Sequence, residues 1–483
     1  MISKKIFLDQ HGCAKNQVDG EILVSRLQKL GMTLTSNPNE ADLILINTCG
    51  FIESAKTESI NSLLQARVSY PNAKILLAGC LAERYAKEFE KELPEADGIF
   101  GNGDLNKIDD VVESLFKNER PVLTPEQKGV CCGERTVSLS FPGSSFVKIT
   151  EGCDNRCSFC AIPIIRGTLR SRKSSEIVAE IKKLIQNNVH EINLIGQDLA
   201  AYGCGKEDDV FGEGSNFYRE MYVNAKNPVI QDEFFKKNHS PLFRLCKMIS
   251  EIQGDFWVRL LYIHPDHFNP DILDLMQEDK RFLPYFDIPF QSGDSEIIKK
   301  MNRKGSAQTY KEIVSLIRKK IPESCIRTTF LTGFPGESEE NAKNTQEFLK
   351  EIRSDWSGCF SYSAEDDTVA AKMKNKVKAK LAQERAQKLE EMQSQITAEN
   401  LKSRINKIYD VLIEEIIENK QGTDEGLAIG RAWFEAPEVD GSFVIRYDLD
   451  DKLAVKNILP GKIVKVKALA SSAVDIDGEY IAS

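Results

Sequence analysis

The chain has 483 residues, of which 41% are hydrophobic and 28% charged, and its formal net charge is −9. This length exceeds what one ordinary hydrophobic core organises, so two or three domains are expected. The negative charge argues against a protein that simply coats nucleic acid, and the sequence contains no apolar run long enough to cross a membrane.

The beginning of the chain has basic residues but no apolar stretch of signal-peptide length. It is more typical of a first β-strand, so we expect the protein to remain in the cytoplasm. The compartment matters because the chain has 12 cysteines. In a reducing compartment, thiols serve metal binding or catalysis more often than disulfide formation.

Residues 1–120 alternate strand and helix patterns. Three apolar runs are typical of buried parallel strands, at residues 6–8, 43–46 and 75–78. An amphipathic stretch at residues 21–30 ends at Gly31, as helices often do. The alternation predicts an N-terminal doubly wound α/β domain, and the Pro- and Gly-rich residues 121–143 predict a linker after it.

The alternation resumes at residue 144 and continues to residue 371. The candidate strands are residues 146–150, 191–195, 257–263, 285–289, 325–332 and 358–362. Helical patterns fill most of the intervals, for example at residues 174–187, 295–301 and 307–319. Six strand–helix units predict a parallel (β/α)6 barrel, complete or open-sided.

Residues 372–404 are rich in Lys, Gln, Glu and Ala, which predicts a long exposed linking helix. The alternating lysines at its start are more typical of a solvated face than of a binding stripe. In residues 405–483 the pattern changes to short β-branched runs separated by turns, at residues 409–413, 426–429, 442–446 and 462–468. This pattern predicts a small antiparallel β-barrel.

Three cysteines lie within eight residues directly after the first strand of the predicted barrel. They are Cys153, Cys157 and Cys160, in the order Cys-Asp-Asn-Arg-Cys-Ser-Phe-Cys. This spacing lets one loop wrap its sulfurs around a single 4Fe–4S cluster, which normally takes four thiolates. Three thiolates leave one iron open, and that iron could bind the amino and carboxylate groups of S-adenosylmethionine. Reduction through it would then produce a 5′-deoxyadenosyl radical.

Two other interpretations of this motif are weaker. A zinc site requires a fourth Cys or His nearby, and none follows closely in the sequence. Cys157 and Cys160 alone resemble a redox dithiol, but Cys153 and the absence of a thioredoxin pattern argue against it.

A second set of cysteines occupies the N-terminal domain. Cys13, Cys49 and Cys80 each follow one of the three predicted strands. The carboxyl ends of parallel strands are where α/β sheets place ligands, so we favour a second three-thiolate cluster with an iron available for a sulfur species. The alternative is that all three are small buried residues.

Several polar residues lie at or near the ends of the predicted barrel strands. Gln197, Gln291 and Arg327 could position S-adenosylmethionine or substrate, or could be ordinary rim residues. His264 and His267 are more typical of an active-site rim or a loop than of a metal site. Residues 205–240 form a long connection rich in aromatic residues, for which we weigh a substrate-contacting lid against a surface embellishment.

Two three-cysteine sets followed by a small β-barrel resemble the methylthiotransferases, a branch of the radical S-adenosylmethionine enzymes. The resemblance covers nearly the whole chain. Its marks are Gly12-Cys13-Ala-Lys-Asn-Gln, Asn47-Thr-Cys49-Gly-Phe, Ala78-Gly-Cys80, the Cys153 motif followed by Ala161-Ile-Pro-Ile-Ile-Arg166-Gly, and Gly196-Gln197-Asp198. It implies a partial (β/α)6 barrel for the central region and a TRAM domain for the C-terminal one.

Most motifs that separate the branches resemble the RimO type, which modifies ribosomal protein uS12. These motifs are residues 152–163, Gln197-Asp-Leu and Ala436-Pro-Glu-Val-Asp-Gly441. The MiaB type, which modifies transfer RNA, usually has Gln-Asn in place of Gln197-Asp198. One departure favours MiaB, because Gln291-Ser-Gly-Asp294 is closer to the Gln-Ser-Gly-Ser of that branch.

The charge of the tail offers an independent test. Residues 406–483 contain 15 acidic and 9 basic residues, a net charge of −6. An acidic barrel repels an RNA backbone and attracts a basic ribosomal protein. We therefore favour uS12, or the small ribosomal subunit that carries it, as the partner.

The resemblance implies a radical methylthiolation at the β-carbon of an aspartate. The cluster on Cys153, Cys157 and Cys160 would generate the radical, and the cluster on Cys13, Cys49 and Cys80 would supply sulfur, methylated by a second S-adenosylmethionine. An electron donor of the flavodoxin or ferredoxin type and a sulfur donor are also implied, with no membrane partner. A non-enzymatic iron–sulfur carrier remains the third hypothesis, and it requires four cysteines for each cluster.

Overall fold

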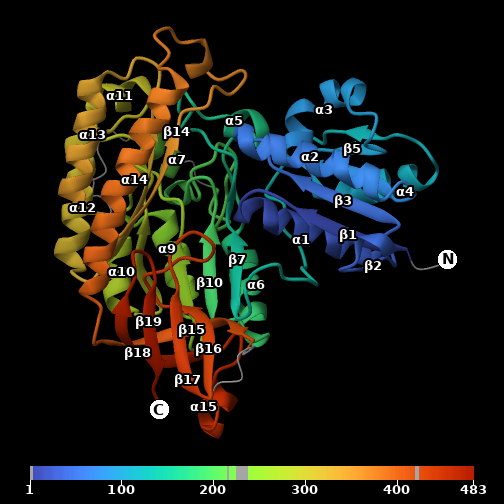
Figure 1. Ribbon diagram of the computed structural model, residues 1–483. Coiled ribbons are helices and arrows are strands. Elements are labelled where there is room, and N and C mark those ends of the chain that lie inside the picture. The colour runs from blue at the N-terminus through green and yellow to red at the C-terminus, as the bar shows by residue number, and fades with distance from the viewer. Residues whose placement is uncertain (1–3, 215–216, 225–237, 419–423, 483) are drawn as a thin grey trace.

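The computed structural model describes residues 4–214, 217–224, 238–418 and 424–482. It shows an N-terminal α/β unit, a central half-barrel and a C-terminal β-barrel (Figure 1). In Figure 1 the N-terminal unit lies at the upper right of the central strands and the C-terminal barrel below them. Of the helices in the described residues, none has the length and apolar character needed to span a membrane.

The N-terminal unit contains a six-stranded sheet in the order β2-β1-β3-β4-β5-β6, with every neighbouring pair parallel. Its strands are β1 (Lys5–Gln10), β2 (Thr33–Leu34), β3 (Leu43–Thr48), β4 (Lys74–Gly79), β5 (Gly98–Phe100) and β6 (Val122–Leu123). Its helices are α1 (Ala14–Lys29), α2 (Glu53–Ser69), α3 (Cys80–Glu92) and α4 (Ile108–Phe116). The predicted doubly wound domain is confirmed. Strand β6 extends it three residues into the segment expected to be a linker.

The central unit contains six parallel strands in the order β14-β13-β12-β11-β10-β7. They are β7 (Ser144–Lys148), β10 (Glu191–Ile195), β11 (Trp257–Leu260), β12 (Phe282–Asp287), β13 (Cys325–Thr332) and β14 (Trp356–Ser361). Among the described strands, β7 and β14 do not pair, so the barrel is open-sided. A short antiparallel pair, β8 (Thr150–Glu151) and β9 (Arg170–Ser171), flanks the loop after β7.

The strands of the central unit differ in extent from their predicted ranges. Strand β11 ends at Leu260 rather than residue 263, because Tyr262 has a φ of 66° and leaves the extended conformation.

The helices that connect the strands are α5 (Ile162–Ile165), α6 (Ser174–Gln186), α7 (Phe217–Asn224), α9 (Pro241–Ser250), α10 (Ile272–Glu278), α11 (Ser295–Lys300), α12 (Ala307–Lys320) and α13 (Glu339–Ile352).

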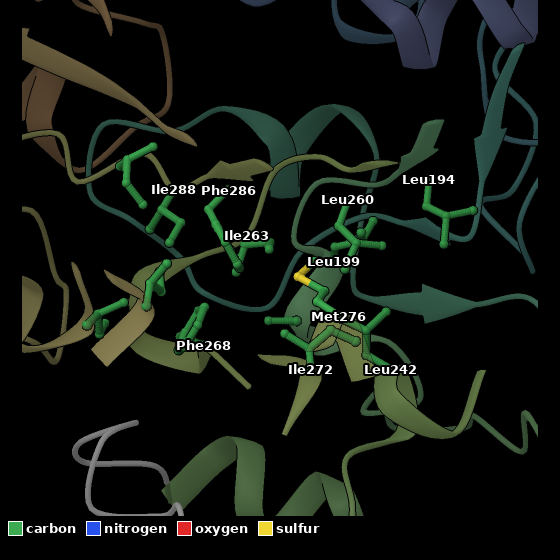
Figure 2. Packing of buried hydrophobic residues seen from close by; sticks show 14 of the residues in the cluster. Leu194, Leu199, Leu242, Leu260, Ile263, Phe268, Ile272, Met276, Phe286 and Ile288 are labelled. Carbon is green, nitrogen blue, oxygen red and sulfur yellow. The ribbon is translucent and has the colours of Figure 1, made fainter. Parts of the chain in front are cut away.

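The core of the central unit lies between the strands and these helices. Figure 2 shows part of it, where Leu260 of β11 and Phe286 of β12 face Leu242 of α9 and Met276 of α10. All four side chains are almost completely buried. This packing fixes the strand ends from which the functional loops emerge.

One helix differs from its prediction. Helix α14 covers Ala379–Lys402, so it begins seven residues later than expected. It is not fully exposed: Ala386, Leu389 and Ile396 are buried against the central core. The prediction of an exposed helix was wrong because it rested on the many lysines. Among these charges, the three apolar side chains recur at helical spacing and form a face that points inward.

The C-terminal region forms a closed barrel in the order β15-β16-β17-β19-β18. Its strands are β15 (Ile408–Ile417), β16 (Glu425–Arg431), β17 (Phe443–Asp448), β18 (Ile463–Ser471) and β19 (Ile476–Tyr480), and helix α15 (Lys452–Asn457) follows β17. The predicted small barrel is confirmed. One pair, β17 with β19, is parallel and the other four are antiparallel.

Candidate functional site

The three-cysteine loop begins with a sharp turn after β8. Gly152 has a φ of 71°, and a Cβ there would lie 2.1 Å from the carbonyl oxygen of Thr168, so the position requires glycine. The amide of Cys160 donates to the carbonyl of Cys157 at 3.0 Å, which curls the loop. The structure thereby brings the thiols of Cys153, Cys157 and Cys160 close enough to influence one another electrostatically.

These three cysteines are partly buried. Burial raises the pKa of Cys160 to about 12 and raises that of Cys153 well above its ordinary value. Burial also raises the pKa of Cys157, although the Arg303 guanidinium opposes this effect. At neutral pH the free thiols therefore keep their protons, and a bound metal centre is needed to stabilise three thiolates together.

Hydrogen bonds surround two of the three sulfurs. The Asn155 side-chain amide donates to the sulfur of Cys153 at 3.4 Å and to the carboxylate of Asp198 at 2.9 Å. His264 Nε2 lies 3.7 Å from the sulfur of Cys157. Because His264 Nδ1 accepts from the amide of Asp266, Nε2 carries the proton and points it at that sulfur.

His264 and His267 lie in the loop that follows β11, and both are buried. Within the described residues, only Asp198, His264 and His267 bring three potential metal-binding atoms within 4.8 Å of one another. His267 Nδ1 already hydrogen-bonds the Asp198 carboxylate at 2.9 Å. We interpret this group as a hydrogen-bond network beneath the cysteine loop.

The three polar candidates at strand ends have different surroundings. Both side-chain amide atoms of Gln197 are buried and have no hydrogen-bond partner among the described residues, which indicates a ligand contact. Gln291 has a φ of 70° and bridges to Phe330 of β13. Arg327 Nε contacts the buried Asp440 carboxylate of the C-terminal barrel at 3.2 Å, so this side chain joins the two units.

The N-terminal cysteines gather at one edge of their sheet. Cys13 caps α1, Cys49 follows β3 and Cys80 opens α3. A Cβ on Gly12 would lie 3.0 Å from the Cβ of Cys49, and one on Gly50 would lie 2.8 Å from the carbonyl oxygen of Cys80. These close approaches require glycine and bring the three cysteines together at the carboxyl ends of β1, β3 and β4.

Arg166 of the segment after α5 connects the two cysteine sets. Its guanidinium donates to the sulfur of Cys80 at 3.1 Å, to Asp19 at 2.9 Å and to Glu151 at 2.5 Å. Burial raises the pKa of Cys80 to about 12, against the influence of Arg166. Arg166 belongs to a sequence motif, but no role could be predicted for it, because only the fold brings it to the N-terminal sheet.

The sequence also gave no indication of a role for Lys15. Its side chain is buried, with 8% of the residue exposed, and its ammonium lies 3.1 Å from the centre of the Tyr262 ring. It forms no ion pair or hydrogen bond with another side chain in the part of the chain that the structure describes. Desolvation opposes ionisation of Cys13, but Lys15 and Arg166 lower the pKa of that thiol.

An open six-stranded parallel barrel with a three-thiol loop after its first strand is the architecture of a radical S-adenosylmethionine enzyme. Residues 147–349 match the Radical SAM superfamily, residues 5–101 match an uncharacterized protein family, UPF0004, and residues 405–481 match the TRAM domain. The predicted radical enzyme class and TRAM domain are therefore confirmed.

Similar curated proteins cover the whole chain. The ribosomal protein uS12 methylthiotransferase RimO of Treponema denticola is 50% identical, with 97% of this chain and 99% of that protein aligned. RimO of Carboxydothermus hydrogenoformans is 36% identical, with 99% of each chain aligned. The solved methyltransferase TsrM of Kitasatospora setae, at 13% identity and a TM-score of 0.47, covers 74% of this chain and 73% of its own.

The chain belongs to the RimO family of radical S-adenosylmethionine methylthiotransferases. Membership implies S-adenosylmethionine and 4Fe–4S clusters as cofactors, as predicted. Two features of the structure fit these groups: two sets of three cysteines that converge at strand ends, and the amide of Gln197, which has no hydrogen-bond partner among the described residues.

Proposed function

We propose that this protein adds a methylthio group to the β-carbon of an aspartate in ribosomal protein uS12. The proposal draws on the printed activity of its relatives. We further propose that it acts in the cytoplasm, on uS12 or on the assembled small subunit. Electrons would come from a flavodoxin or ferredoxin type of donor and sulfur from a separate sulfur donor.

We assign the cluster ligands from the geometry above. Cys153, Cys157 and Cys160 would hold the cluster that binds S-adenosylmethionine, and Cys13, Cys49 and Cys80 would hold the second cluster. When bound, these groups supply the electron for cleavage of S-adenosylmethionine and a site for the sulfur that is inserted. Gln197 would orient S-adenosylmethionine through its free amide, whereas the contact of Arg327 with Asp440 favours a role in joining the units.

The observation that supports a protein substrate is the buried ammonium of Lys15, which has no carboxylate within ion-pairing distance among the described residues. A buried ammonium without a carboxylate partner is costly unless a ligand supplies one. Lys15 follows Cys13 by two residues and lies over the ring of Tyr262, at the carboxyl end of β11. A target aspartate entering between the two cysteine sets would complete an ion pair there, and its β-carbon would be held between them.

The N-terminal unit is placed to exclude water from this space. Asp19 of α1 contacts Lys148 of β7 and Arg166. On the other side of the open barrel, the buried Glu365 accepts from Lys56 at 3.1 Å and from Arg84 at 2.8 Å. These charge-assisted contacts hold the N-terminal sheet over the strand ends, which protects a reactive radical from solvent.

Mass spectrometry of purified substrates tests the proposal. After anaerobic reconstitution, ribosomes should gain one methylthio group on an aspartate of uS12, while transfer RNA should remain unchanged. A methylthiolated adenosine with unmodified uS12 would establish the transfer RNA alternative, which the relatives do not favour.

Two substitutions of one residue test the role of Lys15. Lys15→Met should abolish methylthiolation of uS12 yet retain 5′-deoxyadenosine formation, whereas Lys15→Arg should retain part of both activities because it keeps the charge. Both variants should bind as much iron as the wild type. Full methylthiolation by Lys15→Met would refute the carboxylate contact.

A further inference from the structure

Helix α7 belongs to the long connection between β10 and β11, for which a lid was considered. Residues 215–216 and 225–237 of this connection lie outside the described residues. The part that is described does not stand away from the barrel. Two of its side chains, Arg219 and Tyr222, contact the loop that carries the three cysteines of the central unit.

Arg219 makes the first contact. Its guanidinium pairs with the carboxylate of Asp154 at 2.5 Å and donates to the carbonyl of Cys204 at 3.2 Å. Asp154 also accepts from the amide of Leu169 at 3.1 Å. The ion pair therefore ties α7 to Asp154, which directly follows Cys153 and also bonds the residue just before β9.

Tyr222 makes the second contact and is the more buried, with 7% of the residue exposed. Its hydroxyl donates to the side-chain oxygen of Asn155 at 3.3 Å. Its ring packs on the ring of His267, with the ring centres 4.0 Å apart and the planes inclined by 32°. Tyr222 thus closes the network formed by Asn155, Asp198 and His267 from the side of α7.

The hydroxyl of Tyr222 and the carboxylate of Asp198 together fix which way the Asn155 amide faces. A carboxamide has an oxygen that accepts and a nitrogen that donates. With the oxygen held by Tyr222, the nitrogen is directed at the sulfur of Cys153 and at Asp198. Without the hydroxyl, no other described side chain of α7 holds the amide oxygen, and the amide keeps its bond to Asp198 alone, so its donor is less firmly directed at the sulfur.

We propose that Tyr222 is a positioning residue for the cluster on Cys153, Cys157 and Cys160: through Asn155 it maintains a hydrogen bond to a cluster sulfur and so sets the cluster's reduction potential. This inference rests on the proposed ligation by the three cysteines. It assigns the described part of the connection to the cluster loop rather than to substrate contact, so loss of the Tyr222 contact should impair even uncoupled cleavage of S-adenosylmethionine.

The expected direction follows from electrostatics. Reduction adds negative charge to the cluster, and a hydrogen-bond donor on a sulfur stabilises the more negative state. Loss of the donor should therefore shift the midpoint potential to more negative values. Electron transfer from a weak donor should become slower, while the iron content of the protein and the backbone of the loop remain unchanged.

Tyr222→Phe provides the test, because it removes the hydroxyl and keeps the ring on His267. Tyr218→Phe is a matched control on the same helix, since the Tyr218 hydroxyl donates to the backbone carbonyl of Asn238. Both would be made in a Cys80→Ala background, so that the second cluster does not contribute to the spectra. The readouts are iron content, the electron paramagnetic resonance signal with S-adenosylmethionine, the midpoint potential, and the rate of 5′-deoxyadenosine formation.

The expected result for Tyr222→Phe is full iron content, a more negative midpoint potential, and 5′-deoxyadenosine formation that is slower with a weak reductant than with a strong one. Tyr218→Phe should match its parent in all four readouts. An unchanged potential in Tyr222→Phe would overturn the proposal, as would loss of iron, because that would make Tyr222 a structural support only.

A double variant tests the route through Asn155. Asn155→Leu removes the amide donor, so Tyr222→Phe should cause no further shift in that background. A full additional shift would overturn the proposal, because Tyr222 would then act by another route. Failure of the wild type to show any S-adenosylmethionine-dependent change in its cluster spectrum would instead refute the proposed ligand assignment.

Discussion

The contact between the C-terminal barrel and the central unit depends on a buried arginine. Arg431 ends β16, and 2% of its side chain is exposed. Its guanidinium bonds to Glu191 of β10 at 2.7 and 3.1 Å and to Glu414 of β15 at 2.6 Å. Glu191 is fully buried and is also bound by Arg259 of β11 at 2.9 Å. We predict that Arg431→Met weakens this contact strongly.

The magnitude follows from the charges left behind. Methionine preserves most of the side-chain length, so the main loss is electrostatic. Glu414 would keep no cation within ion-pairing distance among the described residues, and Glu191 would keep Arg259 alone. Breaking a buried pair by removing one partner costs about 3–5 kcal/mol, so the free energy of unfolding should fall by an amount in that range.

Tryptophan fluorescence during urea unfolding measures this loss, because all three tryptophans lie at this interface. The Trp356 indole donates to the carbonyl of Phe434 at 2.8 Å, and Trp257 and Trp433 line a cavity of about 860 Å³ between the units. Arg446→Met is the matched control. Arg446 lies on β17, half exposed and 3.5 Å from Glu425, so its loss should cost about 0–1 kcal/mol.

Equal unfolding midpoints for Arg431→Met and Arg446→Met would refute the reasoning. A loss below about 1 kcal/mol in Arg431→Met would refute it too, since it would mean that solvent reaches Glu191 and Glu414 in the folded state. Because the chain has several units, the transition that reports these tryptophans is compared, rather than one global midpoint.

Two further predictions concern the same charges and the clusters. Burial would raise the pKa of Glu191, but Arg431 and Arg259 hold it well below its ordinary value of 4.5. The stability advantage of the wild type over Glu191→Gln should therefore be full above about pH 4.5 and should shrink as the pH falls. Urea unfolding at several pH values measures this advantage. Iron analysis and product assays should show that Cys153→Ala and Cys13→Ala each reduce roughly eight irons per chain to roughly four; the first should abolish 5′-deoxyadenosine formation, and the second should spare it while stopping methylthiolation. A stability advantage that grows toward low pH would contradict the prediction for Glu191, and methylthiolation by Cys13→Ala would contradict the prediction for the clusters.

The strand-end cysteines could be predicted from the sequence because parallel sheets impose a simple geometry. Residues that follow successive strands meet at one edge, so the positions of Cys13, Cys49 and Cys80 after apolar runs were sufficient. The cysteine loop that begins at Cys153 could be predicted from less information, since the spacing of its cysteines is local in the sequence. In both cases the signal is a short pattern whose structural meaning does not depend on distant contacts.

The residues around these cysteines could not be predicted in the same way. Arg166 reaches Cys80 across two units, and Tyr222 reaches Asn155 from a long connection that has no sequence pattern to fix its path. Lys15 looked like an ordinary helical lysine, and only burial without an ionic partner distinguishes it. Such roles follow from tertiary packing, which neither periodicity nor spacing encodes.

The structure also changes the weight of the charge argument for the substrate. The net charge of −6 in residues 406–483 includes acidic groups that never face a partner. Glu414 pairs with Arg431, Glu435 is fully buried, and the Asp440 carboxylate is buried against Arg327 and Tyr285. The surface of the C-terminal barrel is therefore less acidic than its sequence suggests, and its repulsion of RNA is weaker. Discrimination between uS12 and transfer RNA then depends more on the site, where Lys15, which has no ionic partner among the described residues, suits a carboxylate and offers nothing specific to adenine.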